Sequence, residues 1–322
     1  MAADGRDLPG GIPAIRVALD TTPLRQTRGG TARYVRGLRD HLAAEIVELS
    51  YPATSRLRTA VCDVAWYPRL RAPRAADVLH CPTFRGPFRE TTPLVVTVHD
   101  LAVLRHPEWF NRWTRTYSSF AVPRVVRAAR RVIAVSEFTK RELVELLAIP
   151  ESRIIVVPNA VGAVFTPDGP RAEGDYVLAV GTLEPRKNLE RIARAVDGEL
   201  RVVGARGWGG VQAPANVTWL PDASDEELAA LYRGARCLVY VSLYEGFGIP
   251  VAEALACGCP VVTSAGSPMA DLAGGDAVLV DPADVAAIRD AIARAAPPAP
   301  RRVASWEDVA ARTLAVYEGA AA

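Results

Sequence analysis

The sequence predicts an α/β fold with two domains, each built on a parallel β-sheet covered by helices. Short apolar runs rich in β-branched residues alternate with helical patterns along most of the chain, which is typical of parallel strands joined by crossover helices. The length of 322 residues and an apolar content of 50% are sufficient for two hydrophobic cores of ordinary size.

The first six strands are expected at residues 15–20, 45–51, 77–82, 94–100, 131–136 and 154–158. A polar stretch with several Pro and Gly residues at 162–175 then interrupts the pattern, and we place the domain boundary there. The alternation resumes with strands expected at residues 176–183, 200–204, 217–221, 236–243, 260–264 and 277–281. These limits predict one domain over residues 1–165 and a second over residues 166–304.

A last helical pattern at residues 306–317 follows a Pro-rich segment at 296–302, and the pattern alone does not say to which domain it belongs. In sheets of this kind, ligands bind beyond the C-terminal ends of the strands. Side chains that directly follow the expected strands are therefore the candidates for a functional site.

Cysteine usage and hydropathy favour a cytoplasmic protein without a metal site. The five cysteines are an odd number and include no CxxC pair, so they predict reduced structural thiols. Residues 1–13 hold no apolar signal segment, and no stretch reaches the roughly 18 apolar residues that a membrane-spanning helix requires. Residues 1–165 hold 24 Lys and Arg against 15 Asp and Glu, whereas the rest of the chain is acidic. A basic first half fits solvated helix faces, an anionic acceptor, a phospholipid surface or nucleic acid.

The segment LYEGFGIPVAEALACGCP at residues 243–260 carries the strongest functional signal. It follows an expected strand, turns through Gly246 and Gly248 and enters a helix, which places Glu245 at the C-terminal edge of a sheet. The glycines let backbone N–H groups approach a ligand, and the helix N-terminus favours an anion. Glu253 follows eight residues later, so both carboxylates can accept hydrogen bonds from hydroxyl groups of one ligand. The alternative is that Glu253 only complements the helix dipole and Glu245 only caps a turn.

Arg186 and Lys187 form the second signal, in the segment VGTLEPRKNL at the end of another expected strand. They precede a helix for which Asn188 is the expected N-cap. The chain has only two lysines against 36 arginines, so background composition does not explain an adjacent Arg-Lys pair. An ammonium and a guanidinium can divide two phosphate groups between them, and two solvated loop cations are the alternative.

Two histidines and one aromatic stretch give weaker signals. His99 and His80 each end an expected strand, and each can equally be a packed core histidine, with Asp100 orienting His99. Residues 109–131 combine aromatic residues with arginines. We expect an amphipathic helix that packs on the core, with contact to membrane headgroups as the alternative.

Other nucleotide-binding classes lack their motifs in this chain. No GxxxxGK[ST] segment is present, which argues against a P-loop kinase or ATPase. The segment after the first strand reads RGGTAR at residues 28–33 instead of G-x-G-x-x-G, which argues against a Rossmann dehydrogenase. Only the arginine excess supports nucleic-acid binding, and no nucleic-acid partner is expected.

Together, these segments resemble the retaining glycosyltransferases of family 4, which have the GT-B fold of two Rossmann-like domains with parallel sheets facing across a cleft. The similarity rests on EGFGIPVAEALACGCPVV and VGTLEPRKNL, and it extends over nearly the whole chain through RGGTARYV, VVTVHDLAVLRHPEWF, RVIAVSEFTKREL, IIVVPNAV and SWEDVAARTLAVY. It implies that residues 1–165 form the acceptor-side domain and that residues 166–304 bind the nucleotide sugar. It also implies that the helix in residues 305–322 crosses back onto the first domain.

The resemblance further implies roles for single residues. Arg186 and Lys187 would bind the donor diphosphate, and Glu253 would bind the ribose. Glu245 and the glycine turn after it would hold the transferred sugar, with His99 beside the sugar and the acceptor. The implied catalytic set is His99, Arg186, Lys187 and Glu245, and the implied donor-binding set is Gly29, Gly30, Arg186, Lys187, Glu245, Gly246, Phe247, Gly248 and Glu253.

The expected reaction is transfer of a hexose with retention of configuration to an acceptor that is a glycan, a lipid-linked glycan or a small molecule. The segment VVTVHDLAVLRHPEWF is most similar to mannosyltransferases, so GDP-mannose is the first expected donor and a UDP-hexose the second. No metal or other cofactor is expected, because protein cations would neutralise the leaving diphosphate. A cytoplasmic enzyme is expected, with peripheral contact to the inner membrane face through the basic domain. The alternatives are a nucleotide-sugar epimerase or sugar phosphorylase of the same fold, and a non-catalytic sugar-nucleotide-binding protein.

Overall fold

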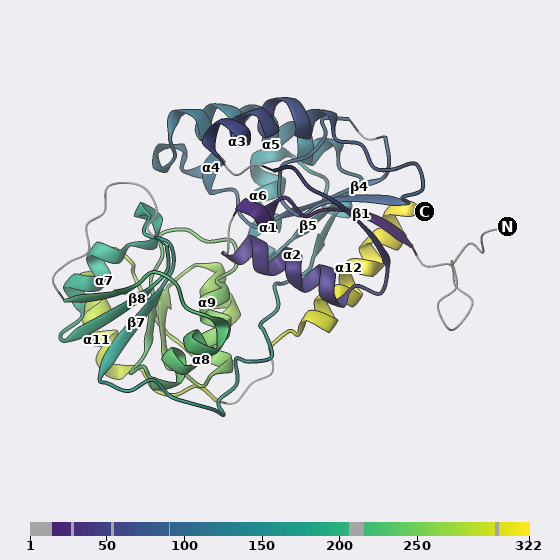
Figure 1. The fold of residues 1–322 in the computed structure, drawn as a ribbon. Coiled ribbons are helices and arrows are strands. Elements are labelled where there is room, and N and C mark those ends of the chain that lie inside the picture. Colours follow the sequence, from purple (N-terminus) through teal and green to yellow (C-terminus); the bar gives the residue numbers. More distant parts are fainter. Residues whose placement is uncertain (1–14, 27–28, 53–54, 90, 206–215, 300–302) are drawn as a thin grey trace. The chain divides into compact units, whose positions relative to one another are not determined.

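The computed structural model describes residues 15–26, 29–52, 55–89, 91–205, 216–299 and 303–322. The expectations for residues 1–13, for Arg28 and for residues 300–302 lie outside these ranges. Among the described residues, the chain divides into two compact units (Figure 1). Unit 1 combines the chain up to Arg105 with Phe110–Ala160 and Trp306–Ala322, and unit 2 combines His106–Trp109 with Val161–Ser305.

Unit 1 contains a six-stranded sheet in the order β2-β1-β3-β4-β5-β6, in which all neighbours are parallel. After β1 the chain first moves outward to β2 and then returns to the other side of β1, so the order reverses between β1 and β3. All five residues of β4 are buried, as expected for a parallel strand that is covered on both faces. The strands are β1 (Arg16–Asp20), β2 (Glu45–Leu49), β3 (Val78–Cys81), β4 (Leu94–Val98), β5 (Arg131–Ala134) and β6 (Ile154–Val156).

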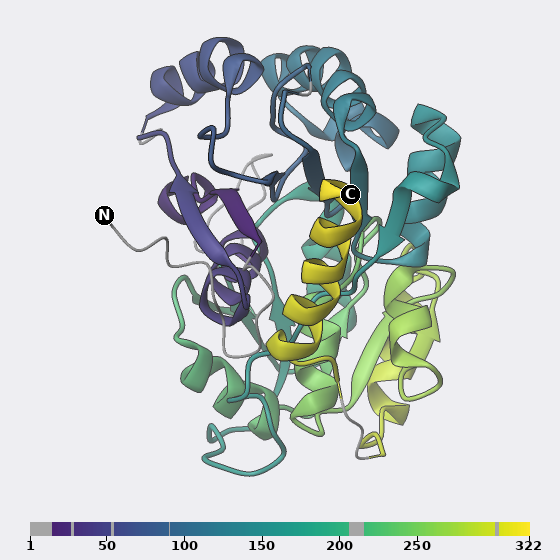
Figure 2. The ribbon, with the colours of Figure 1, turned by 90° about the vertical axis from the view of Figure 1, so that its right-hand side faces the viewer.

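The last helix of the chain, α12 (Trp306–Ala321), belongs to unit 1 and packs against α2, β3 and β4. Figure 2 shows it in yellow beside strands and helices from the beginning of the chain. The other helices of unit 1 are α1 (Pro23–Gln26), α2 (Gly30–His41), α3 (Arg56–Val61), α4 (Ala102–Arg105), α5 (Arg112–Ala128) and α6 (Glu137–Leu147), with the shorter turns η1 (Cys62–Trp66), η2 (Tyr67–Arg69) and η4 (Glu151–Arg153).

Unit 2 contains a second six-stranded parallel sheet, in the order β12-β11-β10-β7-β8-β9. Its strands are β7 (Tyr176–Val180), β8 (Glu199–Val203), β9 (Val217–Leu220), β10 (Leu238–Tyr240), β11 (Val261–Ser264) and β12 (Val278–Val280). Two clusters of buried apolar side chains form its core. The helices are α7 (Leu189–Ala195), α8 (Asp225–Gly234), α9 (Ile249–Ala256), α10 (Pro268–Ala273) and α11 (Val285–Arg294), and the short turns assigned to this unit are η3 (Pro107–Trp109) and η5 (Pro185–Lys187).

The predicted α/β fold with two parallel sheets is confirmed, because each of the twelve ranges expected to form a strand contains one. Several strands are shorter than expected at their C-terminal ends. The range 94–100 forms a strand only to Val98, and the range 236–243 only to Tyr240. His99 and Glu245 therefore lie in loops at the edges of the two sheets, where side chains are not confined to one face.

Within the aromatic stretch at residues 109–131, Arg112–Ala128 form helix α5, which packs on the core as expected, but two of its aromatic side chains point to solvent. Trp113 and Phe120 are 50% and 49% exposed. They lie seven residues apart and therefore on one face of the helix. The opposite face is buried through small and β-branched residues, Ala121, Val122, Val125 and Val126.

Candidate active site

The strongest sequence signals meet where the strand order of unit 2 reverses. The reversal lies between β7 and β10, and ligand sites of parallel sheets form beside the C-terminal strand ends at such a point. Turn η5, with Arg186 and Lys187, follows β7, and the segment with Glu245 follows β10. A backbone hydrogen bond of 2.8 Å from the N–H of Leu243 to the carbonyl of Arg186 joins the two loops.

Two cations and two carboxylates form one ion network in these loops. The Lys187 ammonium donates to Oε1 of Glu245 over 2.5 Å and to the hydroxyl of Tyr240 over 2.6 Å. The Arg186 guanidinium donates to Oε2 of Glu245 over 2.9 Å and to Oε1 of Glu184 over 3.1 Å. The Tyr240 hydroxyl lies 3.0 Å from Oε1 of Glu245 and donates to it. Glu245 is thus held by both predicted phosphate-binding cations.

Burial and ion pairing have opposite effects on the pKa values of Glu245 and Lys187. Burial acts to raise the pKa of Glu245, but the charges of Arg186 and Lys187 outweigh it and lower the pKa to about 2. Burial lowers the pKa of Lys187, and the neighbouring Glu245 opposes that effect. Glu245 is therefore ionised at neutral pH, and the site presents two cations balanced by two carboxylates.

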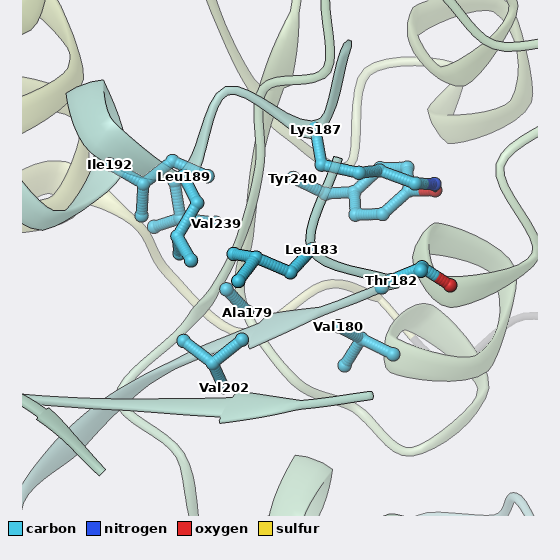
Figure 3. Close-up of a pocket in the computed structure, with 11 residues that line it drawn as sticks. Ala179, Val180, Thr182, Leu183, Lys187, Leu189, Ile192, Val202, Val239 and Tyr240 are labelled. Carbon is cyan, nitrogen blue, oxygen red and sulfur yellow. The ribbon is translucent and has the colours of Figure 1, made fainter. Parts of the chain in front are cut away.

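A cavity lies at the C-terminal ends of β7, β8 and β10, and Lys187 forms part of its wall. Figure 3 shows the side chains of Lys187 and Tyr240 running in the same direction, with their nitrogen and oxygen atoms together at the tip. Thr182 supplies another polar side chain, and the rest of the lining is mainly apolar. The cavity therefore reaches one of the two predicted phosphate-binding cations, Lys187.

Asn188 does not cap α7 through its side chain, which corrects the sequence-based expectation. Its backbone is left-handed, with a φ of 59°, and no side-chain cap hydrogen bond forms. Instead, the side-chain N–H₂ donates to the carbonyls of Val241 over 3.0 Å and Pro282 over 2.7 Å. Asn188 therefore ties the loop after β7 to the end of β10, which helps to hold Arg186 and Lys187 in place.

The glycine turn Gly246, Phe247, Gly248 leads directly into α9. Gly248 is the N-cap residue and has a φ of 98°, a conformation that favours glycine. A Cβ atom at this position would lie 2.5 Å from Cγ of Met269. The turn therefore needs glycine both for its backbone conformation and for space, and Pro250 follows within the first turn of the helix.

Glu253 lies on the same helix but has a different surrounding. Its side chain is buried, and Oε2 accepts a hydrogen bond of 3.0 Å from the hydroxyl of Tyr232 on α8. A buried carboxylate needs such a donor. Tyr232 thereby fixes the orientation of Glu253 within unit 2.

The remaining predicted site residues lie in unit 1. Gly29 is the N-cap residue of α2 and Gly30 is its first residue, and both are exposed. His99 follows β4, and its Nε2 donates to the carbonyl of Pro82 over 3.1 Å. Burial lowers the pKa of His99, against the raising effects of the Pro82 carbonyl and of Asp100. A neutral imidazole with Nε2–H keeps its second nitrogen, Nδ1, as an acceptor.

The structure thus brings Arg186, Lys187 and Glu245 into direct contact, while Glu253 has its own partner. Sequence reasoning missed Tyr240 and Glu184, which complete the network. Tyr240 is the last residue of β10, and a polar side chain at the C-terminal end of an apolar strand was the signal that could have identified it. Within the part of the chain that the structure describes, no group of three His, Cys, Asp or Glu side chains is arranged to hold a metal ion. No described helix is both long and apolar enough to cross a bilayer.

Two protein-family models match the chain. The model described as Glycosyltransferase Family 4 matches residues 28–165, and the model described as Glycosyl transferases group 1 matches residues 210–299.

Two curated relatives illustrate the sequence similarity. The O-antigen chain mannosyltransferase B of Escherichia coli is 29% identical over 282 residues, which cover 75% of this chain and 74% of that protein. The MMP alpha-(1->4)-mannosyltransferase of Mycolicibacterium hassiacum is 30% identical over 271 residues, which cover 71% of this chain and 66% of that protein.

Solved structures of similar fold cover almost the whole chain. Sucrose-phosphate synthase of Thermosynechococcus elongatus has a TM-score of 0.65 and 17% identity, with 95% of this chain and 96% of that chain covered. HepE of Anabaena, in complex with UDP and glucose, has a TM-score of 0.63 and 16% identity, with 95% and 98% covered. At this identity the structural similarity concerns the fold.

Proposed function

We propose that this chain, a glycosyltransferase of the GT-B fold, transfers a hexose from a nucleoside diphosphate sugar to an acceptor hydroxyl with retention of configuration. The proposal proceeds from its family 4 domain and its group 1 domain. The observation that carries the proposal is the contact of Arg186 and Lys187 with Glu245 at the strand reversal of unit 2. Two cations beside a carboxylate suit a ligand in which a diphosphate adjoins a sugar.

In the proposed reaction, the acceptor oxygen forms a bond to the anomeric carbon while the bond from that carbon to the diphosphate oxygen breaks. The acceptor attacks from the face that the diphosphate leaves, and a phosphate oxygen takes the acceptor proton. Arg186 and Lys187 neutralise the charge that develops on the leaving diphosphate, which is the main catalytic term. Glu245 holds the sugar, and Glu253 holds the ribose. His99 lies beside the sugar and the acceptor. The backbone N–H groups at Gly29 and Gly30 approach the distal phosphate.

GDP-mannose is the proposed donor, with a UDP-hexose as the second candidate. The support for mannose is that both relatives described above are named mannosyltransferases. The support for a UDP-linked sugar is that HepE was solved with UDP and glucose. A thermal-shift screen with GDP, UDP and ADP and their sugars separates these candidates, because a ligand at about 100 times its Kd stabilises the folded state by roughly 2.7 kcal/mol.

We further propose that transfer needs no metal ion, since Arg186 and Lys187 supply the positive charge that a divalent cation would otherwise bring. Transfer should therefore continue in EDTA. A complete loss of transfer that added Mg²⁺ or Mn²⁺ restores would overturn this part of the proposal.

The function itself is tested by incubating the preferred donor with candidate hydroxyl acceptors and determining the anomeric configuration of the product by NMR. We expect an α-linked product from an α-linked donor. An inverted product contradicts retention. Conversion of the donor without any acceptor would instead favour an epimerase.

Contact with an anionic membrane is proposed through a surface on α3, η1 and α5, the α3–α5 surface. Five of the seven large apolar side chains that are exposed among the described residues belong to these three elements: Leu57, Val61, Val64, Trp113 and Phe120. Leu57, at 76%, is the most exposed of them. A hydrogen bond of 2.6 Å from the Tyr117 hydroxyl to the Asp63 carbonyl joins α5 to η1. Exposed arginines adjoin these apolar groups, including Arg58, Arg112, Arg115 and Arg124, the last of which lies 3.6 Å from the ring centroid of Phe120.

Exposed apolar side chains beside cations suit the boundary between anionic headgroups and acyl chains. Co-sedimentation with vesicles of phosphatidylcholine and phosphatidylglycerol should show binding that phosphatidylcholine alone does not support. Replacing Trp113 and Phe120 by serine should weaken binding by about tenfold. Leu279→Ser is the matched control, because Leu279 is 47% exposed in unit 2 and should not affect binding. Equal binding by the double variant and the native chain would contradict the proposed surface.

A further inference from the structure

A run of buried hydrogen bonds in unit 1 starts on α12 and continues through β3 and β4 to α2. The Tyr317 hydroxyl lies 2.6 Å from Nδ1 of His80, and Nε2 of His80 lies 2.9 Å from Oγ1 of Thr97. The same Thr97 oxygen lies 2.9 Å from the hydroxyl of Tyr34 on α2. All four side chains are fully buried, and we refer to them together as the α12 network.

His80 is neutral within the α12 network, because burial lowers its pKa to about 3. A neutral imidazole has one N–H donor and one acceptor nitrogen, so the network admits two proton directions. With the proton on Nε2, His80 donates to Thr97 and accepts from the hydroxyl of Tyr317, and with the proton on Nδ1 both bonds run the other way.

The α12 network adjoins both groups that hold His99. The ring of Tyr34 meets the His99 ring edge-on, with 4.9 Å between centroids and an interplanar angle of 85°. The carbonyl that accepts from His99 belongs to Pro82, two residues after His80. Thr97 lies on β4, two residues before His99. The network thus fixes the strand ends and the tyrosine ring around His99.

We propose that the four network residues Tyr317, His80, Thr97 and Tyr34 are positioning residues that hold the imidazole of His99 in one orientation and one tautomer. The last helix of the chain thereby sets the geometry of a side chain at the end of β4. Tyr34 lies on the helix that begins at Gly29 and Gly30, so the same contacts fix the start of α2. The effect on transfer rests on the role proposed for His99, whereas the effect on the His99 ring does not.

The test uses the full chain with ¹⁵N-labelled histidine, because the four histidines give few side-chain signals. In the native chain we expect a neutral Nε2–H signal for His99 and the signals of a neutral imidazole for His80 at pH 7. Tyr317→Phe removes only the hydroxyl that starts the network. We expect the His99 signals to shift or broaden in this variant, and kcat to fall by about tenfold, equivalent to roughly 1.4 kcal/mol, with the donor KM changed less than about twofold.

Tyr176→Phe is the matched control, because it also removes a buried tyrosine hydroxyl, which donates to the Leu231 carbonyl over 2.8 Å in unit 2. The His99 signals and kcat should be native in this variant. Thr97→Val breaks the network between His80 and Tyr34 and replaces Tyr317→Phe if that variant does not fold.

Native His99 signals in both Tyr317→Phe and Thr97→Val would overturn the inference, whatever happens to turnover. Shifted His99 signals with native turnover would leave the positioning role in place and remove His99 from the proposed reaction.

Discussion

The ammonium of Lys187 lies 2.5 Å from Oε1 of Glu245, so two signals separated by 58 residues of sequence form one ion pair. A diphosphate that binds Arg186 and Lys187 must therefore share both cations with the Glu245 carboxylate. Glu245 is at once the proposed sugar ligand and an internal anion at the proposed phosphate site. Because Glu245 has both roles, variants of Lys187 and of Glu245 should differ in their effects on nucleotide binding and on turnover.

Lys187→Ala should weaken binding of the nucleoside diphosphate and slow transfer, because its cation opposes charge that grows as the bond breaks. Removing one hydrogen bond to a charged group typically costs about 1.5 to 3 kcal/mol. Calorimetry with the nucleoside diphosphate and initial rates with the donor measure the two effects. Lys140→Ala is the control, because this other lysine pairs with the exposed Glu151 in unit 1. Native affinity and turnover in Lys187→Ala would remove the phosphate assignment.

Glu245→Gln should separate catalysis from nucleotide binding. The amide cannot support positive charge at the sugar, so kcat should fall by at least about tenfold. The change also removes the anion that competes for Arg186 and Lys187, so the nucleoside diphosphate should bind at least as tightly as it does to the native protein. The same calorimetric and kinetic measurements apply. A loss of affinity as large as the loss of kcat would contradict the placement of the sugar at Glu245.

Glu253→Gln should mainly raise the donor KM and leave kcat close to native. The ribose does not change during the reaction, so a contact to it contributes equally to the ground state and the transition state. Loss of a charged acceptor for hydroxyl groups predicts an increase in KM of about tenfold. Initial rates over a range of donor concentrations give both constants, and an unchanged KM with a reduced kcat would refute the ribose assignment.

Gly37→Ala should destabilise the docking of α12 on α2. A Cβ atom at Gly37 would overlap the indole ring of Trp306, and overpacking of this kind costs about 1 to 3 kcal/mol. Gly319→Ala is the matched control, since a Cβ there meets open space on α12 and alanine favours a helix by about 0.5 to 1 kcal/mol. Urea unfolding followed by circular dichroism should show an earlier transition for Gly37→Ala only.

Because of His80, the folded protein should be less stable in mild acid than at neutral pH. The pKa of His80 is lowered by burial from 6.5 to about 3, so the unfolded chain binds a proton before the folded chain does. The stabilisation from neutral His80 is therefore complete above about pH 6.5 and declines as the pH falls toward 3. At pH 5 the loss is about 2 kcal/mol relative to pH 8. The urea midpoint of His80→Gln should depend less on pH between 8 and 5 than that of the native chain, and equal slopes would argue against a buried neutral His80.

The sequence alone determined the strands and the loops that carry the site. Strands and helices follow from local periodicity and from β-branched content, so every expected strand range contains a strand. The placement of Arg186, Lys187 and Glu245 at strand ends followed from the same patterns, because parallel strands end at a common edge. Part of the glycine requirement at Gly248 was also local, since its φ of 98° favours glycine.

Only the tertiary structure decided which of these groups meet. The contact of Lys187 with Glu245 depends on β7 lying next to β10, a strand order that no local pattern encodes. The exposure of Trp113 and Phe120 depends on which neighbours cover α5. Tyr317 and His80 are 237 residues apart and meet because the last helix returns to the first sheet. Local patterns fix how a segment folds, whereas contacts over such separations depend on how segments pack, and packing is decided by the whole chain.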